Sequence, residues 1–225
     1  MPDAAPPSAP SERTTLKRLP DRGRFDREVL HAILDEALIC HLGFVHDGAP
    51  VVVPTLLGRI DDTLYVHGSV ASRAMRTAGR TEQVCVTATL VDGIVVARSG
   101  FHSSMNYRSA MVFGHARLVD DADEKVRALD AIVDHVMAGR SADLRPHTDV
   151  ELRATTVLAL PLDEASAKVR TGGPVDDEAD LDLDVWAGVL PLRMVAGDAE
   201  PDELLRPDIP VPAYLANYVR PTTAG

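Results

Sequence analysis

The chain has 225 residues, of which 45% are hydrophobic, and it carries a formal net charge of −11 at pH 7. This size and composition fit one large domain with appendages and a substantial apolar core. The acidic balance disfavours non-specific nucleic-acid binding, because neutralising phosphates requires clustered lysine and arginine side chains. No apolar run approaches the ~20 residues of a membrane-spanning helix, and the N-terminus lacks the apolar segment of a secretory signal. We therefore expect a cytoplasmic protein that binds neither nucleic acid nor membrane.

The ends of the chain differ in composition from its middle. Residues 1–18 are rich in Pro, Ser and Ala and are predicted to form a disordered arm. The folded domain is expected over residues 19–195, followed by an acidic, Pro-containing tail over 196–225. Cys40 and Cys85 each lie in an apolar run, which is typical of buried reduced thiols. Their number and spacing predict neither a disulfide framework nor a zinc site.

Two stretches have the periodicity of amphipathic helices. Residues 26–37 carry apolar side chains at helical spacing, with Asp26 as the predicted N-cap. Residues 122–138 repeat the pattern, with one apolar face and one charged face. We expect both helices to pack on a sheet formed by the rest of the chain.

The remaining segments are apolar and predict about six strands joined by tight hairpins. Two Asp-Gly pairs, at positions 47–48 and 92–93, are strong short-range signals for hairpin turns. Several strand segments lack strict alternation of apolar and polar residues, which suits strands covered on both faces. The sequence therefore predicts a mainly β fold with flanking helices, in which an antiparallel, barrel-like sheet has helices packed outside it.

Residues 64–76, with the sequence LYVHGSVASRAMR, predict a strand that leads directly into a helix. Unpaired N–H groups at the helix start, the Ser72 hydroxyl and the Arg73 guanidinium would together suit a phosphate monoester. We expect Arg76 to play little part in such a site. The alternative is that Ser69 or Ser72 only caps the helix and that Arg73 is solvated. The stretch lacks the glycine pattern of a P-loop or dinucleotide fingerprint.

A second polar stretch interrupts the apolar strands, and it is either a solvated hairpin loop or a set of donors that face a ligand. Its polar residues fall within seven positions: His102, Ser103, Ser104, Asn106, Tyr107 and Arg108. The histidines of the chain are scattered without metal-ligand spacing, so no metal site is predicted. A Gly-x-Ser-x-Gly nucleophile motif is absent from the sequence, and we assign no catalytic residue.

Taken together, these stretches resemble the flavin-binding split-barrel family of pyridoxamine 5'-phosphate oxidase-like proteins, and within it the branch of nitroimidazole-resistance-type proteins. The resemblance covers roughly residues 19–195 and rests on residues 51–76, 84–119, 154–172 and 185–192. It implies a six-stranded antiparallel split β-barrel of the FMN-binding type. It also implies a homodimer with one FMN in each of two clefts at the subunit interface.

The resemblance further implies which residues bind the cofactor. The family's phosphate-binding pair corresponds to Ser72 and Arg73. Residues expected beside the phosphate and the ribityl chain are His67, Gly68 and Ser69. The residues whose backbone would face the isoalloxazine ring are Val53, Pro54 and Thr55. Further residues expected near the flavin, in the same subunit or across the dimer, are Ser99, His102, Ser103, Asn106, Tyr107 and Lys168.

The sequence departs from the oxidase that gives the family its name. Ala74 stands where that enzyme has a lysine after Ser-Arg, and Val52 and Leu57 replace basic residues that flank a flavin-binding strand. We therefore do not assign oxidation of pyridoxamine phosphate. The sequence predicts a flavin-dependent oxidoreductase acting on an unidentified small molecule. The alternatives are a non-catalytic flavin carrier or sensor, and a split barrel that binds a deazaflavin or haem, with His102 or His115 as the haem ligand.

Overall fold

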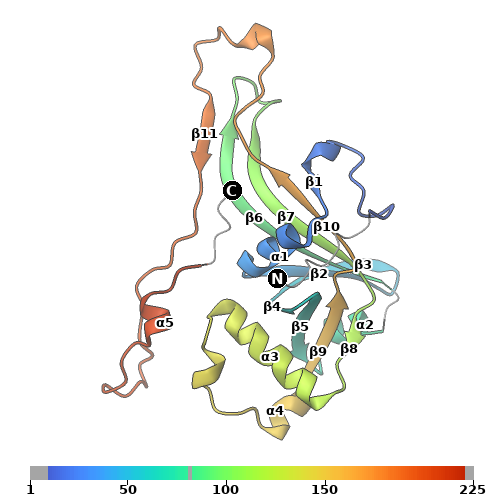
Figure 1. Ribbon diagram of the computed structural model, residues 1–225, viewed down its shortest axis with the longest axis vertical. Coiled ribbons are helices and arrows are strands. Elements are labelled where there is room, and N and C mark those ends of the chain that lie inside the picture. The colour runs from blue at the N-terminus through green and yellow to red at the C-terminus, as the bar shows by residue number, and fades with distance from the viewer. Residues whose placement is uncertain (1–9, 81–82, 221–225) are drawn as a thin grey trace, which may run out of the picture. The chain divides into compact units, whose positions relative to one another are not determined.

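The computed structural model describes residues 10–80 and 83–220 (Figure 1). The predicted disordered arm over 1–18 therefore lies half outside the described residues. The described chain divides into two compact units, each drawn from three separate stretches. Among the described residues, unit 1 is drawn from 10–37, 87–112 and 163–194, and unit 2 from 38–86 (apart from 81–82), 113–162 and 195–220.

Most helices begin at a residue suited to capping. The carboxylate of Asp121 accepts a hydrogen bond from Glu124 N at 2.7 Å, and Thr148 forms a capping box with Glu151. The helices are α1 (Arg27–Glu36), α2 (Arg73–Ala78), α3 (Ala122–Val136), α4 (Asp149–Ala154) and α5 (Ala213–Ala216). Shorter 3-10 turns are η1 (Pro20–Arg22), η2 (Ser141–Asp143) and η3 (Glu178–Asp180).

The strands are antiparallel in every pairing described here, and the prediction of a mainly β fold with flanking helices is confirmed. They are β1 (Gly23–Arg24), β2 (Cys40–His46), β3 (Ala49–Thr55), β4 (Leu57–Ile60), β5 (Thr63–Ser69), β6 (Val84–Val96), β7 (Ser104–Gly114), β8 (Arg117–Leu118), β9 (Thr155–Pro161), β10 (Glu164–Arg170) and β11 (Gly188–Pro191). Among the described residues, no helix has both the length and the apolar character needed to cross a bilayer.

Unit 1 is built on strands β1, β10, β7 and β6, which follow one another in that order, with β11 paired to β6. Helix α1, predicted over 26–37, buries Leu30, Ile33 and Leu34 almost completely. Part of the predicted arm is anchored in this unit, because Ser11 and Arg13 both hydrogen-bond the carboxylate of Glu164 in β10.

The two Asp-Gly pairs have different structures. Asp47 and Gly48 both have positive φ, at 50° and 78°, and form the predicted two-residue turn between β2 and β3. The hairpin predicted at Asp92-Gly93 is wrong, since β6 runs straight through this pair. A Cβ atom at Gly93 would lie 3.1 Å from the carbonyl oxygen of Leu190 in β11, so the glycine here permits close approach of a neighbouring strand.

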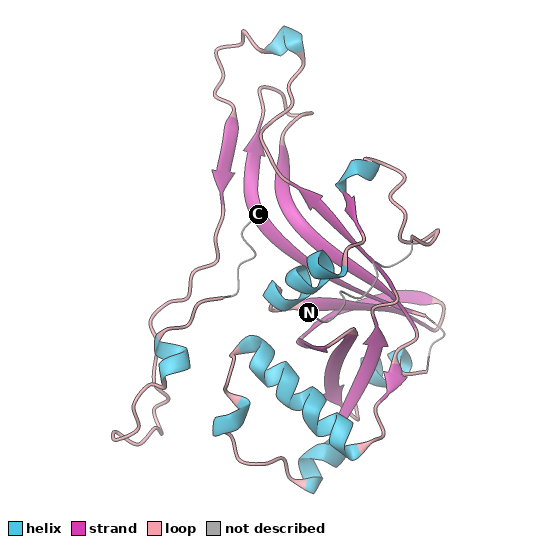
Figure 2. Ribbon diagram, in the orientation of Figure 1, coloured by secondary structure: helices cyan, strands magenta, loops and turns pink. Residues whose placement is uncertain are grey.

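Unit 2 contains a four-stranded sheet in the order β4-β5-β9-β8, and α3 packs on it against β4, β5 and β9 (Figure 2). The apolar face of α3, with Ala128, Leu129 and Ile132, meets Val157 and Ala159 of β9. Helix and sheet come unusually close at β4. A Cβ atom at Gly58 would lie 2.8 Å from both the backbone nitrogen and Cγ1 of Ile132.

The two cysteines lie on strands of the fold. Cys40 is buried in β2, and burial raises the pKa of its thiol to about 12. Cys85 in β6 is only half-buried, but it is also a free thiol. The predicted buried reduced thiol is therefore confirmed at Cys40, where the thiolate is strongly disfavoured.

We predict that Gly58→Ala destabilises the protein by about 1–3 kcal/mol, because the added methyl group must push α3 away from β4. The free energy of unfolding measured in denaturant checks this expectation. Gly100→Ala is the matched control, since a Cβ atom there meets nothing within 4 Å. Equal stability of the Gly58 variant and wild type would contradict the close packing of α3 on the sheet.

Candidate functional site

The strand–turn–helix from β5 to α2 forms as predicted, and its serines shape the turn. Ser72 is the N-cap of α2 and accepts a hydrogen bond from Met75 N at 3.4 Å. Ser69 Oγ accepts from Ala71 N at 3.1 Å. Gly68 allows Met75 to fold back on the strand, because a Cβ atom there would lie 2.8 Å from Met75 Cγ. Ser72 thus has a capping role, which the sequence left open as an alternative to anion binding.

A basic hollow of about 440 Å³ lies beside α2 in unit 2. The residues that line it are Val45, His46, Asp47, Arg73, Arg76, Thr77 and Arg80. Three guanidinium groups therefore face one carboxylate, and the hollow has an excess of positive charge. His46 adds an imidazole, which lies 3.1 Å from the Thr77 hydroxyl through Nδ1.

The three arginines of the hollow differ in their partners. Arg76 donates to the backbone carbonyls of Val70 and Ala71, at 3.3 and 2.6 Å, and so braces the turn before α2. The sequence did not predict this role for Arg76. The side chains of Arg73 and Arg80 are exposed and make no hydrogen bond or ion pair with any residue that the structure describes. Both are therefore available to an anion.

The other predicted residues of unit 2 lie on β3. Val53, Pro54 and Thr55 pair in register with residues of β2, and β3 is the last strand of that sheet in the described chain. Pro54 lacks a backbone N–H and is exposed, as is usual for proline on an edge strand. The structure places this stretch on a sheet edge, where backbone groups are open to a ligand.

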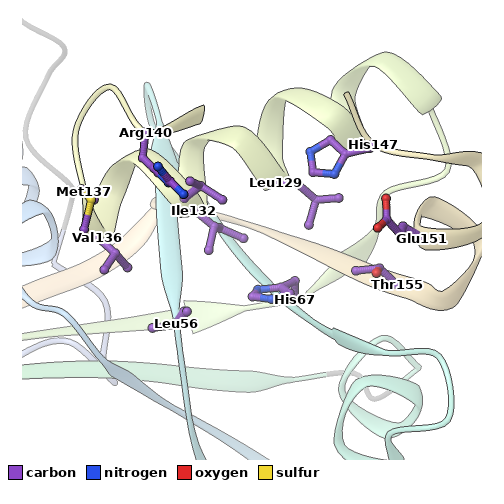
Figure 3. Close-up of a pocket in the computed structure, with 11 residues that line it drawn as sticks. Leu56, His67, Leu129, Ile132, Val136, Met137, Arg140, His147, Glu151 and Thr155 are labelled. Carbon is purple, nitrogen blue, oxygen red and sulfur yellow. The ribbon is translucent and has the colours of Figure 1, made fainter. Parts of the chain in front are cut away.

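A second cavity of about 440 Å³ lies in unit 2 between the four-stranded sheet and α3 (Figure 3). Its wall is mainly apolar. The lining residues are Leu56, His67, Leu129, Ile132, Val133, Val136, Met137, Arg140, His147, Glu151 and Thr155. This apolar cavity has the size and lining that are typical of small-molecule and cofactor sites.

His67 lies in the apolar cavity opposite Leu129 and Ile132 of α3 (Figure 3). Its Nδ1 atom is buried and finds no hydrogen-bond partner among residues 10–80 and 83–220. Burial lowers the pKa of the imidazole below its ordinary value of 6.5. His67 is therefore a neutral imidazole at neutral pH, which is the protonation state that a metal centre requires of a histidine ligand.

The helix wall of the apolar cavity is held to β5 by a polar contact. Tyr65, two residues before His67, donates its hydroxyl to Glu124 Oε1 at 3.0 Å, and Arg117 binds the same carboxylate at 2.6 Å. The Arg117 guanidinium and, more weakly, the Tyr65 hydroxyl hold the pKa of Glu124 below its usual range. Glu124 thus fastens the first turn of α3 to the strand that carries His67.

The polar stretch of unit 1 is a hydrogen-bonded turn between β6 and β7. Ser103 Oγ donates to Ser99 O at 3.0 Å, and the amide of His102 donates to Ser99 Oγ at 3.3 Å. The His102 imidazole lies 3.2 Å from the carboxylate of Asp177. The structure therefore favours the hairpin-loop interpretation for Ser99, His102 and Ser103.

The three remaining predicted residues of unit 1 lie farther along its strands. Asn106 is buried, and its amide accepts from Arg170 and donates to Gly172 O at 3.0 Å, so both of its ends are occupied. Tyr107 is half-buried on β7, and Lys168 pairs with Gly23 in the β1–β10 register. Arg108 binds the carboxylates of Glu36 and Asp92 and links α1 to the sheet.

Of the two histidines that the sequence suggested for haem, neither lines the apolar cavity. His115 is exposed and lies 3.0 Å from the Gln83 amide, and His102 is paired with Asp177. His67 is the better candidate because of its burial, its neutral ring and its apolar surroundings. The sequence placed His67 beside the flavin phosphate and gave no sign of the helix opposite it.

Comparisons with known proteins show the family of the chain and several similar solved structures. The model of a protein family described as pyridoxamine 5'-phosphate oxidase matches residues 26–169. The solved flavocytochrome Anf3 from Azotobacter vinelandii is 41% identical, with a TM-score of 0.87 over 93% of this chain and 97% of that one. An FAD and heme binding protein from Mycobacterium smegmatis is 37% identical, with a TM-score of 0.82 over 86% and 95% of the two chains.

A third solved structure is less similar to this chain. A candidate 5-nitroimidazole antibiotic resistance protein from Bacteroides thetaiotaomicron is 29% identical, with a TM-score of 0.56 over 65% of this chain and 86% of that one. None of the curated proteins compared with the chain matches it.

We predict that Glu124 stabilises the folded protein above about pH 4.5 and that this contribution is lost as the pH falls. Arg117 and Tyr65 favour the ionised carboxylate, so the folded pKa lies below the ordinary value of 4.5 and the unfolded chain takes up the proton first. Wild type should be more stable than Glu124→Gln at neutral pH, and the difference should shrink at lower pH.

Urea unfolding of both proteins at about pH 7 and about pH 4 checks this prediction. Glu203→Gln is the control, because Glu203 is exposed. A difference between wild type and Glu124→Gln that stays the same at both pH values would show that ionisation of Glu124 does not contribute to stability.

Proposed function

The chain belongs to the pyridoxamine 5'-phosphate oxidase family, and we propose that it is a flavin-binding redox protein whose basic hollow holds the phosphate groups of the flavin. The observation that carries this proposal is the set of three guanidinium groups, with Arg73 and Arg80 free of partners among the described residues. Guanidinium groups bind phosphate oxygens through paired, charge-assisted hydrogen bonds.

The excess of positive charge favours a diphosphate over a monoester. Arg73, Arg76 and Arg80 line one hollow with a single carboxylate, that of Asp47. The relative from Mycobacterium smegmatis is described as binding FAD, whose two phosphates carry the charge that three arginines suit. We therefore propose FAD as the flavin, and the FMN predicted from the sequence is the alternative that the experiment below distinguishes.

A bound flavin would supply hydride and single-electron transfer, which side chains alone cannot perform. The residues of this chain would bind and orient it, with Arg73 and Arg80 on the phosphates and Arg76 bracing the turn. Val53, Pro54 and Thr55 stay our assignments for the ring, and a homodimer stays our expectation for the assembly. The small-molecule substrate is outside this proposal.

A second function, haem binding, is favoured by one specific observation. The apolar cavity contains a neutral histidine whose buried Nδ1 has no partner among the described residues. These residues fit a haem, since an apolar wall suits the porphyrin and His67 suits the iron. The Azotobacter vinelandii relative is described as a flavocytochrome, and the Mycobacterium smegmatis relative as binding both FAD and haem. We propose His67 as the haem ligand in this chain.

Purified protein should carry an oxidised-flavin spectrum, and mass spectrometry of the released chromophore should find FAD. Arg73→Ala should weaken flavin binding roughly 10- to 100-fold, the effect of losing a hydrogen bond between charged groups. Arg153→Ala should leave affinity unchanged, because Arg153 is an exposed arginine of unit 2 outside the hollow. Equal loss from both variants, or a colourless protein that ignores added FAD and FMN, would overturn the phosphate assignment.

Bleaching of the flavin absorbance by NADH or NADPH, followed by reoxidation on adding an acceptor, would distinguish an oxidoreductase from a flavin carrier. A flavin that stays oxidised with both nucleotides would favour the carrier or sensor. The flavin affinities of the Arg73→Ala and Arg153→Ala variants test the phosphate site whether the protein is an oxidoreductase or a carrier.

Haem reconstitution of the apoprotein should give a shifted Soret band, and His67→Ala should abolish it. His102→Ala and His115→Ala should keep it, because both histidines lie outside the apolar cavity. Retained flavin absorbance in His67→Ala would show that the variant is folded. A Soret band that survives in His67→Ala and disappears in His102→Ala or His115→Ala would return the ligand assignment to those residues.

A further inference from the structure

One end of the apolar cavity carries a cation. Arg140 lies beyond the last turn of α3, near Val136 and Met137, and His147 and Glu151 lie at the opposite end (Figure 3). Arg140 is the one arginine among the cavity's lining residues. An apolar cavity with a cation at one end matches a ligand with an apolar body and an acidic group at one end.

The charges at the opposite end are already paired. Arg145 holds both oxygens of Glu151, at 2.5 and 2.9 Å, and Thr148 donates to the same carboxylate. These contacts, Arg145 first, hold the pKa of Glu151 well below its usual range. His147 Nε2 lies 3.0 Å from Asp130. The charge of Glu151 is thus balanced by Arg145. None of these groups at this end of the cavity is an unpaired cation that could bind an acidic group of a ligand.

Arg140 has a different set of contacts. Its Nη1 donates to the Tyr214 hydroxyl at 2.9 Å, and no carboxylate forms an ion pair with it among the described residues. Tyr214 in turn donates to Asp143 Oδ2 at 2.7 Å, so Arg140 and Asp143 are bridged by the phenol. The guanidinium therefore keeps its other N–H groups for a ligand.

The turn that carries Arg140 is itself fixed. Gly139 has a φ of 87°, which is the left-handed conformation that glycine tolerates best. Ser141, on the other side of Arg140, donates through its backbone N and its hydroxyl to the carboxylate of Asp134, at 2.8 and 2.7 Å. Ser141 is thus held against α3, and Gly139 lets the chain turn just before Arg140.

The C-terminal segment, residues 212–220, completes the support. Tyr214 lies in α5, and farther along the segment Arg220 donates to the backbone carbonyl of His135 at 3.0 Å. The segment is therefore attached at two points, to His135 in α3 and to Arg140 just beyond it, and Arg140 lines the cavity. The hydrogen bond from Arg140 to the Tyr214 hydroxyl therefore links the position of Arg140 to that of the C-terminal segment.

From these contacts we propose that Arg140 recognises an acidic group of the cavity's ligand, and that the C-terminal segment positions Arg140 through Tyr214. The inference rests on the proposed haem site, where the acidic groups are the two propionates. A side chain that is fixed before binding loses less conformational entropy when the ligand arrives. Arg140 is the binding residue, and Tyr214 is a positioning residue that does not touch the ligand.

The test compares haemin with haemin dimethyl ester, in which both propionates are uncharged. Wild-type apoprotein should bind haemin roughly tenfold more tightly than the ester, as expected for one charge-assisted contact at a half-exposed site. Arg140→Gln should bind the two forms equally, and Arg140→Lys should restore part of the preference. Arg153→Gln, the control outside the cavity, should keep the full preference.

A second pair of variants tests the positioning role. Tyr214→Phe should lower the preference for haemin and increase cleavage of the C-terminal segment by trypsin. Tyr218→Phe is the matched control, since the Tyr218 hydroxyl makes no hydrogen bond within the described residues. Unchanged preference and unchanged cleavage in Tyr214→Phe would overturn the positioning role.

The outcomes separate this inference from the haem proposal itself. Wild-type protein that binds haemin and its dimethyl ester equally would overturn the role of Arg140 and leave His67 as the ligand. Wild-type protein that binds neither form would overturn the haem proposal, and the inference would fall with it. A preference for haemin that persists in Arg140→Gln and disappears in His147→Gln would move acid recognition to the other end of the cavity.

Discussion

The close approach of α3 to the sheet of unit 2 is the constraint on which both the cavity and its polar groups depend. Gly58 leaves no room for a Cβ atom beneath Ile132, because the backbone of the helix at Ala131 and Ile132 lies directly against the strand. The same helix carries Leu129 and Ile132 on the cavity wall and ends at the turn that presents Arg140. Because the interior is close-packed, a displaced helix would move the wall and the cation together.

Both proposed cofactor sites share the strand and turn that lead into α2. His67 projects from β5 into the apolar cavity, and Ser72 and Arg73 follow five and six residues later at the start of α2. The hydrogen bonds of Ser69, Ser72 and Arg76 fix the turn between them. A single local structure, made from small residues and one bracing arginine, therefore sets the positions of the proposed anion-binding arginine and of a neutral imidazole within unit 2.

Local signals in the sequence predicted local structure well, and long-range contacts explain the failures. Both amphipathic helices and the Asp47-Gly48 turn are confirmed, because each is encoded by neighbouring residues. The family resemblance, which rests on several separate stretches, is confirmed over residues 26–169. Asp92-Gly93 looks the same in the sequence but lies within a strand, because β11, about a hundred residues later, needs the space at Gly93. The sequence likewise did not predict the cavity around His67, because its opposite wall is formed by residues 129–136 of α3, far along the chain.

Hydrogen-bond partners distinguish His67 from the other histidines better than burial does. A histidine retained for packing or solubility normally has its ring nitrogens satisfied, and His147 with Asp130, His115 with Gln83 and His46 with Thr77 fit that rule. His67 Nδ1 is buried without a partner in the described chain, which costs about 1–3 kcal/mol of folding free energy. A ligand in the apolar cavity would compensate for this loss, and the surrounding apolar wall supports the proposal that the ligand is a haem.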